Sequence, residues 1–215
     1  MWELFLRAYP FLLEGLLVTV VLGVSSFTIG SAIGLATALA RLSSIAALRA
    51  LAIAYLSVFR GTPMLVQLLL IYFGLPQFGI TLEPIPSAII ALSLNVGSYQ
   101  SENFRSGILG VDRGQREAAF SIGMTGWQAL RRIIFPQALR IAAPTIGNRF
   151  IALMKDTSLA SVVTVVELTR IAERIGSSTF RYMEMFVMVA AVYWLLNSAL
   201  SLGQAALERR LARAY

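Results

Sequence analysis

The stretch MFVMVAAVYWLLNSALSLGQAAL, residues 185–207, contains no charged side chain. A second stretch, residues 11–40, carries a single charge, Glu14. A helix needs about 20 consecutive apolar residues to cross the hydrocarbon core of a bilayer. Both stretches are long enough, so we expect an all-α integral membrane protein.

The composition of the whole chain agrees with this expectation. The sequence has 215 residues, of which 57% are hydrophobic and 13% are charged, and its mean hydropathy is +0.73. These values are not those of a soluble globular domain. We predict a single transmembrane domain over residues 1–215. Its five spans are predicted at about 11–40, 51–76, 87–107, 141–166 and 185–207, with a polar loop at about 113–138.

The formal net charge of +7 follows the predicted topology rather than a nucleic-acid surface. One side of the predicted spans receives eleven arginines and the other side receives four. The first group is Arg41, Arg49, Arg105, Arg113, Arg116, Arg131, Arg132, Arg140, Arg209, Arg210 and Arg213; the second is Arg7, Arg170, Arg174 and Arg181. The positive-inside rule then places the N-terminus outside and the C-terminus in the cytoplasm. We expect a multi-pass protein of the cell (inner) membrane, with lipid and not nucleic acid around it.

Missing residue types exclude several kinds of chemistry. The sequence contains no cysteine and no histidine, which excludes thiol redox chemistry, zinc sites with nitrogen or sulfur ligands, and histidine acid–base catalysis. Lys155 is the only lysine and is followed by Asp156, so no GxxxxGK[ST] phosphate loop is present. We therefore expect no catalytic residue, no metal and no cofactor on this chain. Active transport would need a separate ATPase.

The predicted second span contains the sequence Arg60-Gly61-Thr62-Pro63. Pro63 lacks an N–H group and disfavours helical geometry at Thr62, so the helix should break there. Irregular backbone at membrane depth is tolerated only where it is buried or lines a wet cavity. An arginine at this depth is costly, which favours a functional role for Arg60. The alternative is a packing kink with Arg60 reaching toward the interface.

The predicted third span ends in a polar segment. Glu102 and Arg105 are three residues apart and share a helix face, so we expect them to pair as a gate or a scaffold. Tyr99 lies one turn further into the membrane on the same face. It is a candidate pocket residue, and an interfacial tyrosine is the alternative.

The predicted fourth span contains Arg149, Lys155, Asp156 and Ser158. Ionisable residues inside a membrane indicate a functional site. The adjacent Lys155 and Asp156 point in different directions, so each needs its own partner. Ser158 lies three residues after Lys155, a spacing that an intramembrane hydrolase could use, but the chain has no other protease signature.

The polar loop contains Glu117-Ala118-Ala119-Phe120-Ser121-Ile122-Gly123. We predict a short helix over residues 115–122, with Ala118, Ala119 and Ile122 facing a partner. Gly123 suits the C-terminal turn, where a positive φ is inexpensive only for glycine. Thr125 and Gln128 have the spacing of a capping box that begins a second helix.

This loop resembles the EAA loop of ATP-binding-cassette (ABC) importer permeases. The family pattern is Glu-Ala-Ala, three residues, Gly, nine residues, then Ile-x-Leu-Pro. The matching residues are Glu117, Ala118, Ala119, Gly123, Ile133 and Pro136, with Phe135 in place of leucine. In that family the loop docks onto the ATPase subunit.

Other segments resemble the polar amino-acid branch of these permeases, of the histidine/glutamine type. They are Arg60-Gly61-Thr62-Pro63, the third-span segment from Gly97 to Ile108, and Lys155-Asp156-Thr157-Ser158-Leu159. Arg149 departs from the acidic or amide residue that relatives often carry, which leaves the charge of the substrate open.

The resemblance implies a type I importer fold with five transmembrane helices. It also implies a second permease (identical or different), two ATPase subunits that bind ATP and magnesium, an external solute-binding protein and a polar amino acid as substrate. Arg60, Thr62 and the amide after Gly61 would hold the α-carboxylate. Asp156 or Glu102 would hold the α-ammonium. The alternative function is a passive channel or a structural membrane subunit without ATP coupling.

Overall fold

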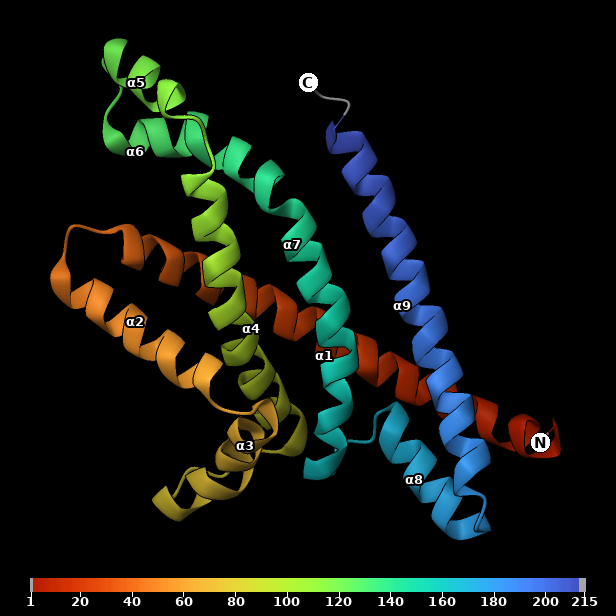
Figure 1. Cartoon of the computed structure of the whole chain (residues 1–215). Helices are drawn as coiled ribbons and strands as arrows, with labels where there is room; N and C mark the ends of the chain where they lie inside the picture. The colour runs from red at the N-terminus through yellow and green to blue at the C-terminus, as the bar shows by residue number, and fades with distance from the viewer. Residues whose placement is uncertain (1, 213–215) are drawn as a thin grey trace.

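The computed structural model describes residues 2–212, and the elements in this range are all helical (Figure 1). Arg213, counted above among the arginines of one side, lies outside the described residues. The α-helices are α1 (Trp2–Leu42), α2 (Ala46–Gly61), α3 (Met64–Leu69), α4 (Pro84–Leu109), α5 (Arg113–Ser121), α6 (Gly126–Ala129), α7 (Phe135–Asp156), α8 (Leu168–Thr179) and α9 (Tyr182–Ala212). The shorter elements are the π-helices η1 (Leu70–Gly74) and η3 (Leu130–Ile134) and the 3₁₀-helices η2 (Leu75–Phe78) and η4 (Thr157–Val163).

Length and apolar composition identify two helices within the described range that can cross a membrane, α1 and α9. A third candidate is the pair 46–61 and 64–78, which is bent by 106° at its break. Helices α4 and α7 contain 26 and 22 residues, lengths that suffice for a span, but each carries several polar side chains. The more polar composition of α4 and α7 follows from their position, because they contact each other and α1.

Two features of the fold differ from the expectations. The fourth span is expected to reach residue 166, but its α-helix ends at Asp156 and continues as η4. The segment after it forms α8, a helix that the sequence reading did not predict. Leu168, Ile171 and Ala172 are buried at helical spacing and would have indicated it.

The central packing contact is between α1 and α4, and small residues on α1 permit it. A Cβ atom on Gly34 would lie 2.7 Å from Cβ of Gln100, and one on Gly30 would lie 2.8 Å from the carbonyl oxygen of Ser93. Neither position has room for a larger side chain. The glycines therefore bring the two helix backbones together, as small residues do in membrane proteins.

A buried carboxylate fixes the start of α8. Glu167 is fully buried and caps the helix, accepting hydrogen bonds from the N–H groups of Thr169 and Arg170, both at 2.9 Å. The hydroxyl of Tyr193 on α9 also donates to it at 2.9 Å. Burial raises the pKa of the Glu167 carboxyl, and these hydrogen bonds only partly offset that effect. The contact joins α8 to α9.

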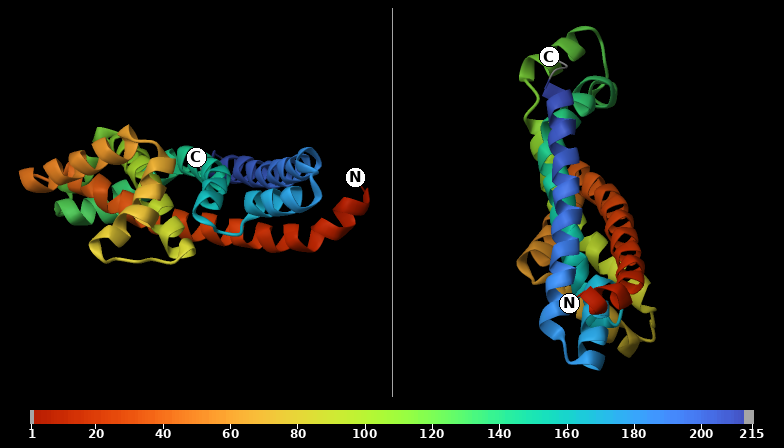
Figure 2. Two further views of the ribbon diagram at one scale, coloured as in Figure 1. Left: turned by 90° about the horizontal axis from the view of Figure 1, so that it is seen from below. Right: turned by 90° about the vertical axis from the view of Figure 1, so that its right-hand side faces the viewer.

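The helices place α5 and α6 at one end of the molecule. The C-terminal end of α9 lies toward this same end (Figure 1). Helix α8 and the N-terminal part of α1 lie at the opposite end, as the second view of Figure 2 also shows. Two surfaces are thus separated along the long axis, with the polar residues of α4 and α7 between them.

Candidate functional site

The break between α2 and α3 is held by one buried side chain. Pro63 has no N–H group, so the carbonyl of Phe59, four residues earlier, lacks its usual helical donor. The side-chain nitrogen Nε2 of Gln67 donates in its place. It lies 3.0 Å from the carbonyl oxygen of Phe59 and 3.1 Å from that of Thr62. It also donates to the hydroxyl of Thr62 at 2.9 Å. The predicted break is confirmed, and its freed carbonyls are satisfied inside the protein, as a membrane interior requires.

Gln67 begins a chain of polar contacts across three helices. Nδ2 of Asn95 on α4 donates to Oε1 of Gln67 at 3.0 Å. Oδ1 of Asn95 accepts from Nη2 of Arg149 on α7 at 2.9 Å, and Nη1 of Arg149 pairs with Asp156 at 3.2 Å. The partner that Asp156 was expected to need is therefore Arg149, seven residues earlier on the same face of α7. This chain ties the broken span to α4 and α7.

The ring of Tyr99 on α4 lies against two arginines. The guanidinium carbon of Arg149 is 4.6 Å from the ring centre, and that of Arg60 on α2 is 5.6 Å from it. Both distances are within the range of cation–π attraction. Tyr99 thus lies between the broken span and the fourth span, the two segments that carry the other candidate pocket residues.

Glu102, one turn along α4, is surrounded by guanidinium groups. Nε of Arg105 lies 3.0 Å from its carboxylate, which confirms the expected pair. Arg41, at the end of α1, also forms an ion pair and a hydrogen bond with it. Nη1 of Arg60 lies 3.8 Å away, at the outer limit for an ion pair. One carboxylate therefore joins α1, α2 and α4.

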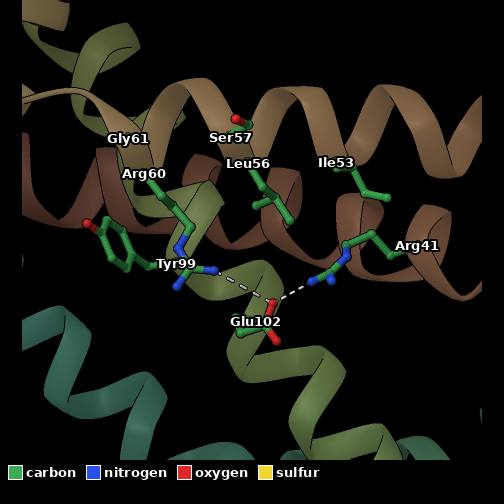
Figure 3. Close-up of a pocket in the computed structure, with 8 residues that line it drawn as sticks. All are labelled: Arg41, Ile53, Leu56, Ser57, Arg60, Gly61, Tyr99 and Glu102. Atoms are coloured by element: carbon green, nitrogen blue, oxygen red, sulfur yellow. Dashed lines mark hydrogen bonds and ion pairs between the residues drawn. The ribbon is translucent and has the colours of Figure 1, made fainter.

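These residues border a cavity of about 630 Å³ between α2 and α4. Figure 3 shows Arg60 and Arg41 extending toward Glu102 from either side, with Tyr99 beside Arg60. The cavity is large enough for an amino-acid-sized ligand, since ligand pockets usually measure about 300–1,000 Å³. Its lining residues are Arg41, Ile53, Leu56, Ser57, Arg60, Gly61, Tyr99 and Glu102.

Two predicted residues do not join this cluster. The hydroxyl of Ser158 donates to the backbone carbonyl of Lys155 at 2.7 Å, and the Lys155 side chain is exposed. The hydroxyl is thus directed at a main-chain oxygen rather than at an amine base. The geometry gives no support to a Ser158/Lys155 hydrolase.

Three residues of the cluster were missed by the sequence reading. Gln67 and Asn95 are nearly buried, at 6% and 4% exposure, and each interrupts an apolar run. That interruption was the available signal, because a buried amide needs partners. Arg41 was counted only as a topology charge, and nothing in its local sequence indicates the contact with Glu102.

The polar loop forms the hairpin of α5 and α6, close to its predicted form. Gly123 lies in the turn that follows α5 and has a φ of +79°, as expected for that position. The hydroxyl of Thr125 accepts from the N–H of Gln128 at 3.3 Å, and the Gln128 side chain accepts from the N–H of Thr125 at 2.9 Å. The predicted capping box is confirmed. Pro136 stands in the first turn of α7, where a missing N–H costs little.

The surface of α5 differs from the prediction at one position. Ala119 is only 3% exposed and packs inside the hairpin against residues such as Ala129 and Ile134, so the prediction that it faces a partner is wrong. Glu117 and Ala118 are exposed. Phe120 and Ile122 expose 50% and 73% of their surface. The free face of α5 is therefore more apolar than the motif alone suggests.

Within residues 2–212, no group of three or more acidic side chains lies close enough to hold a metal ion. The clustered charges are arginines with single carboxylates. This arrangement suits recognition of an anionic organic group more than coordination of a cation.

The chain was compared with known families, curated proteins and solved structures. Residues 30–213 match the family described as the binding-protein-dependent transport system inner membrane component. The chain is 46% identical to the L-cystine transport system permease protein TcyB of Bacillus subtilis, over 99% of this chain and 92% of that protein. It is 35% identical to the glutamine transport system permease protein GlnP of Escherichia coli, over 98% and 97%.

The solved structures agree. An amino acid ABC transporter with histidines superposes with a TM-score of 0.90 at 41% identity, covering 95% of this chain and 96% of that chain. The MetNI methionine ABC transporter in an inward-facing form has a TM-score of 0.74 at 21% identity and supports the fold alone. The fold is the helical membrane fold of type I ABC importer permeases. This chain belongs to the family of binding-protein-dependent transport system inner membrane components: it is a non-catalytic permease subunit of an ABC importer, driven by a separate ATPase.

Proposed function

We propose that this permease subunit forms the pathway for a polar amino acid, together with a second permease that is either identical or related. The observation that carries the proposal is the cavity of about 630 Å³ beside the broken span. It combines a charged donor, Arg60, with the main chain of Gly61 at a point where the helix is interrupted. The names of the relatives, which refer to L-cystine and glutamine transport, support an amino-acid substrate.

Within the cavity, Arg60 binds the α-carboxylate of the substrate. Its side chain is 43% exposed, and its one anionic partner within residues 2–212 is Glu102 at 3.8 Å, so it can form a charge-assisted hydrogen bond without breaking a short ion pair. Thr62 positions this segment through its bonds to Gln67 and Val58. For the α-ammonium, Glu102 is favoured over Asp156, because Glu102 lines the cavity and Asp156 does not.

The ATPase subunit docks on the hairpin of α5 and α6. Phe120 and Ile122 supply the apolar contact, Glu117 supplies an orienting charge, and Gly123 sets the angle between the two helices. ATP and magnesium bind to the ATPase subunit, since this chain has no phosphate loop. Closure of the two ATPase subunits moves the hairpin, and the spans then alternate access to the cavity.

The hairpin end of the molecule faces the cytoplasm, and the end that carries α8 faces outside. The arginine asymmetry of the sequence supports this orientation. An external solute-binding protein delivers the amino acid at the α8 end.

Substrate-stimulated ATP hydrolysis by the assembled complex tests the proposal. Replacing Gly123 by valine should abolish the stimulation, because valine is strained at a φ of +79°, while insertion into the membrane continues. Gly126→Ala, at a site where an added Cβ meets no other atom, is the matched control. A Gly123→Val complex that assembles and transports at the normal rate contradicts the docking assignment.

A further inference from the structure

The charges around the cavity do not balance. Three guanidinium groups, those of Arg41, Arg60 and Arg105, share the single carboxylate of Glu102. On the other side of Tyr99, Arg149 is paired with Asp156. These six groups comprise four cations and two anions, and each anion already has a close guanidinium partner. The cluster therefore carries an excess of positive charge on side chains that are 17% to 43% exposed, where an uncompensated charge is less well hydrated than on an open surface.

Two of the four guanidinium groups lack a full set of close acceptors. Arg60 is the most exposed of them, and its nearest carboxylate oxygen lies 3.8 Å away. Arg149 uses both terminal nitrogens, but its Nε is buried and has no hydrogen-bond acceptor within the described residues. Both groups lie against the ring of Tyr99, at 5.6 Å and 4.6 Å from its centre. The two guanidinium carbons therefore lie no further apart than the sum of these two distances.

We propose that the substrate carries two carboxylates, one held by Arg60 and the other balanced by Arg149 across Tyr99. This inference rests on the proposed function and adds the charge class of the substrate. A second carboxylate supplies the anion that the cluster lacks. A basic side chain would add a further cation to a cluster that is already positive, so lysine and arginine are excluded.

The test compares ligands that differ only in carboxylate count, on the permease purified in complex with its ATPase subunits. The pairs are L-glutamate with L-glutamine, L-aspartate with L-asparagine, and L-cystine with cystamine, the diamine that lacks both carboxylates; L-lysine and L-arginine complete the series. Ligand binding is measured by calorimetry. We expect at least one dicarboxylate to bind about tenfold or more tightly than its partner, as one charge-assisted contact provides.

The ratio of the two affinities within a ligand pair should fall toward one in the variant Arg149→Gln. It should stay unchanged in the control Arg170→Gln on α8. The ratio in the unmodified complex is itself decisive if Arg149→Gln fails to assemble. Tightest binding of a neutral or basic amino acid overturns the charge class and leaves the proposed function standing. A complex that binds none of the amino acids contradicts both.

Discussion

Gln67→Leu removes the side chain that closes the break between α2 and α3. The change removes four hydrogen bonds. Three are donated by the side-chain nitrogen of Gln67 to the carbonyl oxygens of Phe59 and Thr62 and to the Thr62 hydroxyl, at 3.0, 3.1 and 2.9 Å, and the fourth is donated by Nδ2 of Asn95 to Oε1 of Gln67 at 3.0 Å. The two side chains involved are nearly buried, with Gln67 6% and Asn95 4% exposed. Leucine has a similar volume, so the loss is mainly of hydrogen bonds.

The expected cost follows from these four contacts, of which the one from Asn95 is partly replaced, because its Nδ2 keeps the Phe59 carbonyl oxygen at 3.4 Å. Each hydrogen bond contributes about 1 kcal/mol net, and orphaned buried groups cost somewhat more. The free energy of unfolding should therefore fall by about 3 kcal/mol, which is roughly a hundredfold in the equilibrium constant. Denaturant unfolding of the detergent-purified complex measures this change.

A matched control is available on the same segment. Gln77→Leu replaces an exposed glutamine on η2 and should change the free energy of unfolding by less than about 0.5 kcal/mol. If Gln67→Leu is as stable as Gln77→Leu, the break is not held by the Gln67 amide.

Three further predictions follow from other parts of the chain. Burial raises the pKa of the Glu167 carboxyl, so above the ordinary carboxyl pKa the folded state binds more protons than the unfolded state. Stability should therefore fall as the pH rises from the ordinary pKa through the raised pKa. Glu167→Gln should flatten this dependence in melting temperatures measured between pH 4 and 8, and an unchanged dependence contradicts the assignment. Cysteines introduced singly at Pro84 and Gly126 should label and not label, respectively, with an impermeant reagent applied outside, and the reverse pattern inverts the topology. Replacing both Phe120 and Ile122 by serine should reduce co-purification of the ATPase subunit without lowering the amount of this chain in the membrane. The same double change at Met183 and Phe186, which are exposed on α9, should not reduce it. Equal recovery of the ATPase subunit with both double variants excludes the exposed face of α5 as the docking surface.

Local chemistry decided most of what the sequence could predict. The break at Pro63, the positive φ at Gly123 and the capping box of Thr125 and Gln128 each depend on residues within a few positions of one another. The Glu102–Arg105 pair depends only on helical spacing. Such features can be read before any tertiary contact is known.

The rest depended on which helices meet. Asn95 follows Gln67 by 28 positions, and Arg149 follows Asn95 by 54, so their contacts arise only when α3, α4 and α7 pack together. The burial of Ala119 required the return of the chain through α6. The motif identified the docking helix correctly but could not show which of its side chains face outward.

The pocket at the broken span is tested most directly by transport through complexes that carry Arg60→Gln or Asp156→Asn, measured together with the yield of assembled complex. The account predicts normal yield for Arg60→Gln and a substrate requirement raised by about ten- to a hundredfold, the loss expected for one hydrogen bond to a charged group. Asp156→Asn should raise it less, because Asp156 acts through Arg149. Normal yield with unchanged transport in both variants would contradict the pocket.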